Sequence, residues 1–157
     1  MNIPGHMEHS ASVLADSIAR IHSYVVPRES VVPYKRVPTK KGVGTGFFVP
    51  GGQTGRFPLL VTCAHVVKDA HRIGVVLPTT SGEELPARAK LIVPDYDLAI
   101  IQIEAPMDAK SKVRTLPVGD SDALQPGEHL FAIGFPLGQE GFKITDGVFS
   151  GQEGNNL

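Results

Sequence analysis

Short apolar runs separated by turn-forming residues dominate the chain after Gly42. Each run is four to eight residues long and rich in β-branched or aromatic side chains, which is typical of strands. Turns with Gly, Pro and Ser separate the runs. We predict strands over residues 46–49, 59–63, 73–77, 87–93, 98–103, 130–133 and about 142–149. Six of these strands precede Gly134. Six strands are enough to close one small barrel, which removes exposed strand edges.

The N-terminal region has a different spacing. Leu14, Ile18 and Ile21 fall at i, i+4 and i+7, which predicts a short amphipathic helix over about residues 8–23. Asp16 and Arg20 lie on the opposite face, and this face lacks the basic residues of membrane-surface helices. We therefore expect the helix to pack on a larger body, followed by a proline-punctuated linker.

Composition narrows the classes of function. The 157 residues, of which 41% are hydrophobic, suffice for one domain with a core. A net charge of −1 gives no electrostatic reason to expect a nucleic-acid partner. The single cysteine excludes an internal disulfide and a zinc site made of cysteines alone. With neither a membrane-length apolar run nor a secretory signal pattern, we expect no membrane partner and a cytoplasmic location.

His65 is the first candidate for chemistry. The apolar strand 59–63 and the small residues Cys63 and Ala64 lead directly to this imidazole, which titrates near neutral pH. Such a histidine is more often a hydrogen-bonded core residue than a catalyst. Asp97 adjoins the apolar strand 98–103, where a carboxylate needs a hydrogen-bond partner. It could orient His65 and stabilise the imidazolium, or it could cap a turn at the strand start.

Two weaker patterns carry other interpretations. Gly42-x-Gly44-x-Gly46 could suggest a phosphate-binding loop. Such a loop leads into a helix, whereas this segment precedes a predicted strand, so we do not assign it that role. Three histidines near the N-terminus could form a weak metal site, but we favour solvent-exposed side chains for His6, His9 and His22. We therefore predict neither a bound metal nor an organic cofactor.

Several ordered segments resemble one family. Gly44-Thr45-Gly46-Phe47, the segment 61–67 (Val-Thr-Cys-Ala-His-Val-Val) and Asp97-Leu98-Ala99-Ile100 are similar to the N-terminal half of trypsin-like serine proteases of the bacterial HtrA/Deg type. The resemblance continues through segments 116–122, 127–128, 132–138 and 145–150. It implies an all-β double-barrel fold and an endopeptidase acting on protein or peptide substrates. His65 would be the general base and Asp97 the group that orients it.

The resemblance also shows what the sequence does not contain. Family members carry the nucleophilic serine, and the N–H groups of the oxyanion hole, in a Gly-x-Ser-Gly-Gly-type turn, and no such turn occurs here. Ser81 and Ser121 lie in predicted turns, and Ser150 matches a strand position. Cys63 matches a position of small structural residues, so we predict a buried packing thiol rather than a nucleophile. We expect no proteolysis by the isolated chain, because the triad lacks its nucleophile.

The resemblance suggests three regions. Residues 1–41 would be an N-terminal helix and linker, residues 42–138 the first barrel, and residues 139–157 the first strand of an incomplete second barrel. Because such a strand would lack partners, we expect the chain to be a fragment of a protease. The alternative is a non-catalytic interaction module whose unpaired C-terminal strand binds a second copy or another protein by strand addition. A separate chain supplying the second barrel is a third arrangement.

Overall fold

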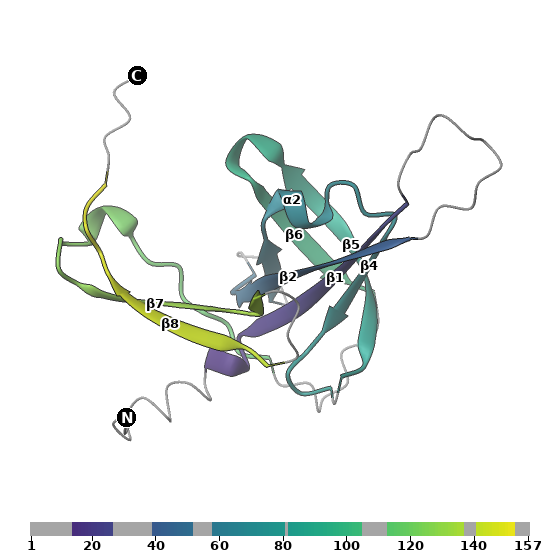
Figure 1. The fold of residues 1–157 in the computed structure, drawn as a ribbon, viewed down its shortest axis with the longest axis horizontal. Helices are drawn as coiled ribbons and strands as arrows, with labels where there is room; N and C mark the ends of the chain where they lie inside the picture. The colour runs from purple at the N-terminus through teal and green to yellow at the C-terminus, as the bar shows by residue number, and fades with distance from the viewer. Residues whose placement is uncertain are drawn as a thin grey trace.

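Six antiparallel strands close into a barrel in the order β1-β2-β3-β6-β5-β4 (Figure 1). The computed structural model describes residues 14–26, 39–51, 58–80, 82–104, 113–136 and 141–152. The barrel strands are β1 (Ile18–Val25), β2 (Lys40–Val49), β3 (Leu59–Thr62), β4 (Arg72–Val76), β5 (Glu84–Val93) and β6 (Leu98–Ile103). The predicted all-β class and the six-stranded barrel are confirmed.

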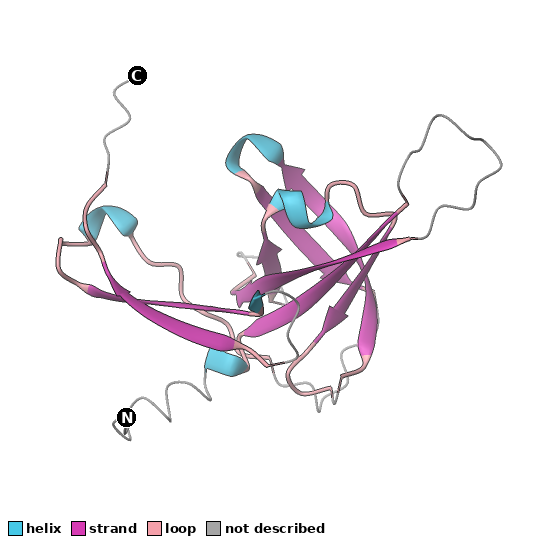
Figure 2. Cartoon of the chain, in the orientation of Figure 1, coloured by secondary structure: helices cyan, strands magenta, loops and turns pink. Residues whose placement is uncertain are grey.

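A two-stranded antiparallel sheet lies beside the barrel, formed by β7 (His129–Gly134) and β8 (Lys143–Val148). Helical structure in the described ranges is confined to short segments (Figure 2). Those with printed bounds are α2 (Ala64–Val67) and the 3-10 turns η1 (Pro94–Tyr96) and η2 (Ser121–Ala123). Within the described residues, no helix has the length and apolar character needed to cross a membrane.

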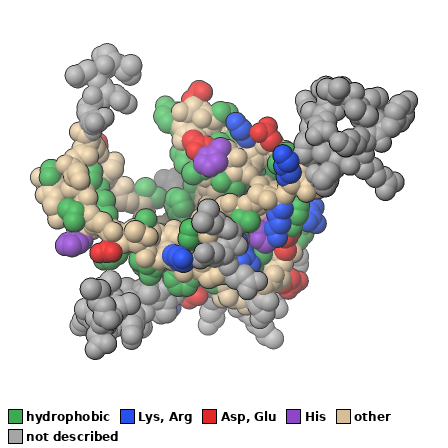
Figure 3. All heavy atoms as spheres, in the orientation of Figure 1, with side chains coloured by type: hydrophobic (Ala, Val, Ile, Leu, Met, Phe, Trp, Pro, Cys, Tyr) green, Lys and Arg blue, Asp and Glu red, His purple; other side chains and the backbone are tan. Residues whose placement is uncertain are grey.

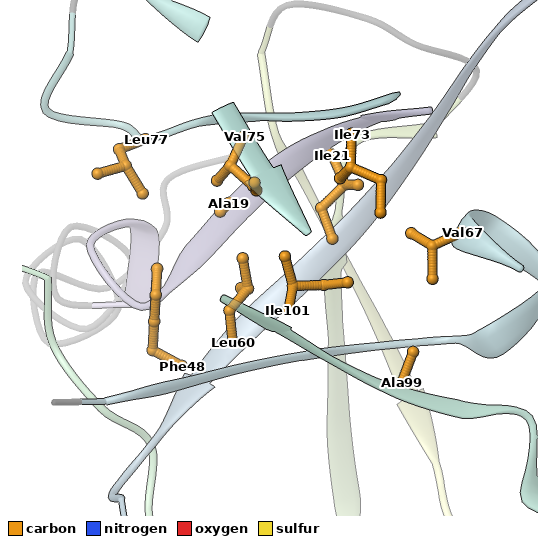
Figure 4. Close-up of a cluster of buried hydrophobic side chains, with 11 residues drawn as sticks. Ala19, Ile21, Phe48, Leu60, Val67, Ile73, Val75, Leu77, Ala99 and Ile101 are labelled. Carbon is orange, nitrogen blue, oxygen red and sulfur yellow. The ribbon is translucent and has the colours of Figure 1, made fainter. Parts of the chain in front are cut away.

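The barrel is filled by apolar side chains that converge from all six strands and from α2 (Figure 4). Phe48, Leu60 and Val75 are almost fully buried in it. Burying one such side chain contributes about 1.5–3 kcal/mol, so this cluster is the main source of stability for the barrel. The other members are Ala19, Ile21, Val67, Ile73, Leu77, Ala87, Ala99 and Ile101.

The first barrel strand, β1, overturns the N-terminal helix prediction for residues 18–23, whereas Leu14 and Ala15 are helical as predicted. Residues 18–25 form a strand that pairs with β2 on one side and with β4 on the other. The helical spacing of Ile18 and Ile21 is coincidental, since Ala19, His22 and Ser23 are buried as well. Residues of both faces of β1 are buried, which is compatible with a strand, and its β-branched residues favour that conformation. Residues 8–13 of the predicted helix lie outside the described ranges.

The place of residues 130–133 also differs from the prediction. A strand is present there, as expected, but it belongs to the two-stranded sheet and pairs with β8 rather than closing the barrel. The reason is that β1 already supplies the sixth barrel strand. The strand predicted over residues 98–103 is found with the same ends, as β6. The other predicted strands are found with shifted ends, and β2 begins at Lys40 instead of residue 46.

The glycines of β2 have a packing role rather than a phosphate-binding one. A Cβ on Gly46 would lie 2.8 Å from side-chain atoms of both Ile21 and Leu60. A Cβ on Gly44 would lie 2.6 Å from the side chain of Val66, which belongs to α2. Because side chains alternate along a strand, Gly44 and Gly46 leave space on the same face for the core and for α2.

Thr45 connects the barrel to the two-stranded sheet. Its carbonyl oxygen accepts a 2.8 Å hydrogen bond from the Thr62 hydroxyl at the end of β3. Its own hydroxyl oxygen accepts a 2.9 Å hydrogen bond from the backbone N–H of Phe135, which directly follows β7. Thr45, Phe135 and Lys143 also line an open pocket at this junction. The sheet is therefore positioned relative to the strand that leads to His65.

Candidate active site

His65 lies on α2, the single helical turn that follows β3. Strand β3 is held between β2 and β6, which fixes the point at which the chain leaves the barrel. The Ala64 N–H donates a 2.9 Å hydrogen bond to the backbone carbonyl of Asp97, and the Lys68 N–H donates a 2.9 Å bond to Ala64. Val67 then anchors the turn in the core. His65 therefore lies on a helical turn that is held at its start by the Ala64 hydrogen bond and at its end by the buried Val67 side chain.

Asp97 approaches the same point from η1. It caps this 3-10 turn through a 3.0 Å hydrogen bond from its N–H to the carbonyl of Pro94. Its φ of 50° and ψ of 40° are left-handed, and among the described residues it alone combines a side chain with positive φ. Aspartate tolerates this region better than most residues, and such strain persists where the surroundings determine it. The turn-cap interpretation of Asp97 therefore holds together with the His65 contact.

Both carboxylate oxygens of Asp97 bind His65. Oδ1 accepts a 2.8 Å hydrogen bond from the His65 backbone N–H. Oδ2 lies 2.7 Å from the ring Nδ1. An ionised carboxylate can only accept, so Nδ1 carries the hydrogen and the neutral ring presents the lone pair of Nε2. The expected contact is present, and it fixes both the orientation and the tautomer of the imidazole.

The pair lies at the surface, with 66% of the His65 side chain and 49% of the Asp97 side chain exposed. In the space-filling view, a histidine lies next to an acidic side chain over α2 (Figure 3). The backbone hydrogen bond from His65, followed by the one from its ring, holds the pKa of Asp97 below its usual value. Asp97 is therefore anionic near neutral pH. The alternative of a buried core histidine does not apply to His65.

Cys63 contradicts the prediction of a buried thiol, because it is exposed. It is the N-cap of α2, at the end of the barrel where the chain leaves the core, and the core itself is filled by Ala64 and Val67. Partial desolvation raises the pKa of the Cys63 thiol, and the charge of Asp97 raises it further. Ligand atoms of Cys63, His65 and Asp97 all lie within 4.8 Å of one another. Within the described ranges, this is the group with the composition of a metal site.

Two of the remaining candidates are serines that belong to other parts of the described structure. Ser121 is exposed on η2, and Ser150 is exposed just beyond β8, as expected for residues without a catalytic role. Ser81, His6 and His9 fall outside the described residues. Neither of the two described serines is therefore assigned as a nucleophile for the pair of His65 and Asp97.

His22 corrects the expectation of a solvent-exposed side chain. It is buried on β1, and its Nδ1 lies 2.7 Å from Oε2 of Glu84. Tyr24 donates a 2.8 Å hydrogen bond to the same oxygen, and Arg72 lies 3.4 Å from Oε1. Sequence reasoning missed this cluster because the pairing of β1 with β4 and of β4 with β5 creates it, and β1 was predicted as helix.

Comparisons with known proteins agree with the fold described above. A family model described as "Trypsin-like peptidase domain" matches residues 44–156. Over 150 residues the chain is 35% identical to "Serine protease HTRA1B" of Danio rerio, covering 94% of this chain and 29% of the relative. Over 153 residues it is 30% identical to "Serine protease HTRA1" of Xenopus laevis, covering 96% of this chain and 31% of the relative.

A bacterial relative shows the same correspondence. The chain is 39% identical over 114 residues to "Probable periplasmic serine endoprotease DegP-like" of Chlamydia trachomatis, covering 73% of this chain and 20% of the relative. The chain therefore spans between about a fifth and a third of the length of these curated relatives. The matched region includes the strands and turns that carry both His65 and Asp97.

Proposed function

Because this chain belongs to the trypsin-like peptidases of the HtrA type, we propose that His65 and Asp97 supply the general base and its orienting carboxylate for a serine endopeptidase site. The observation that carries this proposal is the 2.7 Å contact between His65 Nδ1 and Asp97 Oδ2, at a histidine whose side chain is 66% exposed. The contact orients the ring, and the exposure gives a substrate access to Nε2.

Each residue has one task in this mechanism. Nε2 of His65 takes the proton of the attacking serine hydroxyl and later gives it to the leaving amine. Asp97 stays ionised and stabilises the imidazolium that forms between these two transfers. Protein or peptide chains are the substrates. His65 and Asp97 need no metal for either proton transfer.

We assign no residue of this sequence as the nucleophile. No Gly-x-Ser-Gly-Gly turn occurs among the 157 residues, so the triad and its oxyanion hole are incomplete within this sequence. We assign β1–β6 to the first barrel and β7 with β8 to the start of the second. This assignment replaces the prediction that the first barrel ends at residue 138. The sequence of the source gene beyond the Leu157 codon tests this assignment, since an open frame encoding that turn supports it and an immediate stop codon contradicts it.

A first experiment tests the pair in the isolated chain. Nitrogen-15 NMR of the imidazole should show the tautomer protonated at Nδ1 for His65, and Asp97→Asn should shift the population away from it. His71→Gln, which alters another exposed histidine, is the control and should leave the His65 signals in place. An Nε2-protonated ring in the unmodified chain contradicts the proposed base.

A second experiment tests the missing nucleophile. The purified chain should not hydrolyse casein, and hydrolysis that is lost in His65→Ala would show that a nucleophile is present after all. In a longer product containing the serine turn, Asp97→Asn should lower kcat by about 10⁴-fold, the size of this effect in a serine protease triad. A loss of less than tenfold would remove Asp97 from the mechanism.

A specific observation favours the second candidate function, a protein-interaction module. The two-stranded sheet exposes several apolar side chains, namely Leu130, Phe131, Ile144 and Val148. Strand pairing or apolar contact could bind a second copy or another protein there. Light scattering of the purified chain at micromolar concentration tests the interaction function. A dimer that dissociates when Phe131→Ser is introduced supports this function.

The expected partners and location remain predictions. A peptidase of this family acts on proteins or peptides, and the net charge of −1 favours no nucleic acid. One relative is named as a periplasmic endoprotease, so the predicted cytoplasmic location needs its own measurement. Fractionation of cells expressing the natural gene would provide it.

A further inference from the structure

We propose that Cys63, His65 and Asp97 form a binding site for one zinc ion, which pulls the imidazole away from its partner carboxylate. The sulfur of Cys63, the ring nitrogen of His65 and a carboxylate oxygen of Asp97 lie within 4.8 Å of one another. Three protein ligands with an open fourth position for water are the usual composition of a non-structural zinc site. All three groups lie near the surface, so an ion can reach them from solvent.

The donor set selects the ion. A thiolate and an imidazole suit zinc and similar thiophilic cations, whereas magnesium and calcium prefer sites made of oxygen ligands alone. His65 and Asp97 by themselves would offer only two ligands. Cys63 therefore converts a hydrogen-bonded pair into a three-ligand cluster.

The geometry requires a small rearrangement. Ligand atoms of a tetrahedral zinc ion stand about 3.3–3.7 Å apart, given metal–ligand bonds of about 2.0–2.3 Å. The 2.7 Å separation of Nδ1 and Oδ2 must therefore open to admit the ion. The His65 side chain is 66% exposed and has room to rotate. Asp97 can stay in place, because its Oδ1 remains bonded to the His65 backbone N–H.

The protons balance in this binding step. The Cys63 thiol loses one proton to solvent, and Asp97 is already anionic. The Nδ1 hydrogen of His65 is replaced by zinc and is taken up at Nε2, so the ring stays neutral. The consequence, which rests on the proposed function, is that Nε2 no longer offers a lone pair. Zinc would then block the general base without touching the nucleophile.

Cobalt(II) is the probe that tests the site. Titration of the metal-free purified chain should give a thiolate-to-cobalt charge-transfer absorption at one ion per chain, and zinc should displace it. The chain has a single cysteine, so this absorption identifies Cys63 as the ligand. Cys63→Ser should abolish the absorption and weaken zinc binding at least about tenfold by calorimetry, since one of three ligands is lost. His71→Gln is the matched control and should bind as the unmodified chain does.

Each outcome decides the proposal. Absence of the charge-transfer absorption overturns it, as does zinc affinity that Cys63→Ser changes less than twofold. An equal loss in His71→Gln would place the ion elsewhere on the chain. A circular dichroism spectrum unchanged by Cys63→Ser shows that the variant still folds. None of these measurements uses proteolysis, so failure of the zinc site leaves the test of the His65 tautomer unaffected.

Discussion

Two histidine–carboxylate pairs in this molecule share one contact distance and differ in everything around it. Nδ1 lies 2.7 Å from a carboxylate oxygen both in His65–Asp97 and in His22–Glu84. In the first pair, 66% of the histidine side chain is exposed, against 8% in the second. The hydrogen bond alone therefore does not mark an active site. The surroundings of the ring decide whether the pair can act on another molecule.

The two carboxylates differ in their partners. Glu84 is shared by His22, Tyr24 and Arg72, so its oxygens connect strands β1, β4 and β5 within the barrel wall. The Asp97 carboxylate is bound mainly by one residue, through the ring and the backbone of His65, with a weaker side-chain contact from Cys63. The Glu84 cluster stabilises the barrel, whereas the Asp97 contacts orient one side chain. A mutation that separates stability from orientation tests this comparison.

Glu84→Ala should have the largest effect on stability. It leaves His22 and the Tyr24 hydroxyl without their partner, and each unsatisfied group costs about 1–3 kcal/mol. We expect the free energy of unfolding, measured in urea, to fall by about 2–4 kcal/mol. Glu104→Ala is the matched control, because Glu104 is half-exposed and its 3.5 Å contact with Arg88 contributes little. Equal losses in the two variants would contradict a structural role for Glu84.

Gly44→Ala should affect the site through α2. The added Cβ would lie 2.6 Å from the Val66 side chain, next to His65, so the helical turn must shift. Overpacking of this kind costs about 1–3 kcal/mol, and the His65 imidazole signals should move in NMR spectra. Gly147→Ala adds the same methyl group where no atom lies within 4 Å. If both variants leave the His65 signals unchanged, Gly44 does not position α2.

The smallest effect concerns acid stability. Burial raises the pKa of Glu84, but the hydrogen bonds from His22 and Tyr24 outweigh burial, so the pKa of Glu84 is lowered. The pKa of Asp97 is lowered by the hydrogen bonds from His65. A lowered pKa in the folded state means that the unfolded chain binds more protons in acid. The stabilisation is therefore present above the unfolded values of about 4.3 and 3.9, and is lost as the pH falls through the folded values.

Variants separate the two contributions. Glu84→Gln should flatten the loss of unfolding free energy below about pH 4, which urea titrations at several pH values would measure. Asp97→Asn should change the pH dependence of the unfolding free energy less, because solvent screens the exposed pair. Asparagine also tolerates the left-handed backbone and can still accept the hydrogen bond from the His65 N–H. A steeper dependence on Asp97 than on Glu84 would reverse the comparison.

The barrel strands from β2 to β6 were accessible to sequence reasoning because turn residues interrupt short apolar runs. Strand β1 was not, since Ile18 and Ile21 also fit a helical period, and only the closed barrel requires a strand there. Strand β7 illustrates a second limit. Its apolar pattern predicts a strand, but the choice between the barrel and β8 depends on contacts that no local pattern contains.

The candidate site shows the same division. His65 and Asp97 could be found from their positions beside apolar strands and from the family resemblance, and the contact between them is present. The left-handed backbone of Asp97 has no clear sequence signal, because aspartate is also common in ordinary turns. Cys63 was misplaced because a small residue after a buried strand suggests burial, whereas the chain leaves the barrel at that point.

Thr45 links the accuracy of the site to the neighbouring sheet. Its hydroxyl oxygen holds the Phe135 N–H after β7, and its carbonyl holds the Thr62 hydroxyl, at the end of the strand that leads into α2. A rotation of the two-stranded sheet would thus be transmitted through two hydrogen bonds to the base of the helical turn carrying His65. The orientation of the imidazole and the position of the two-stranded sheet are therefore linked through Thr45.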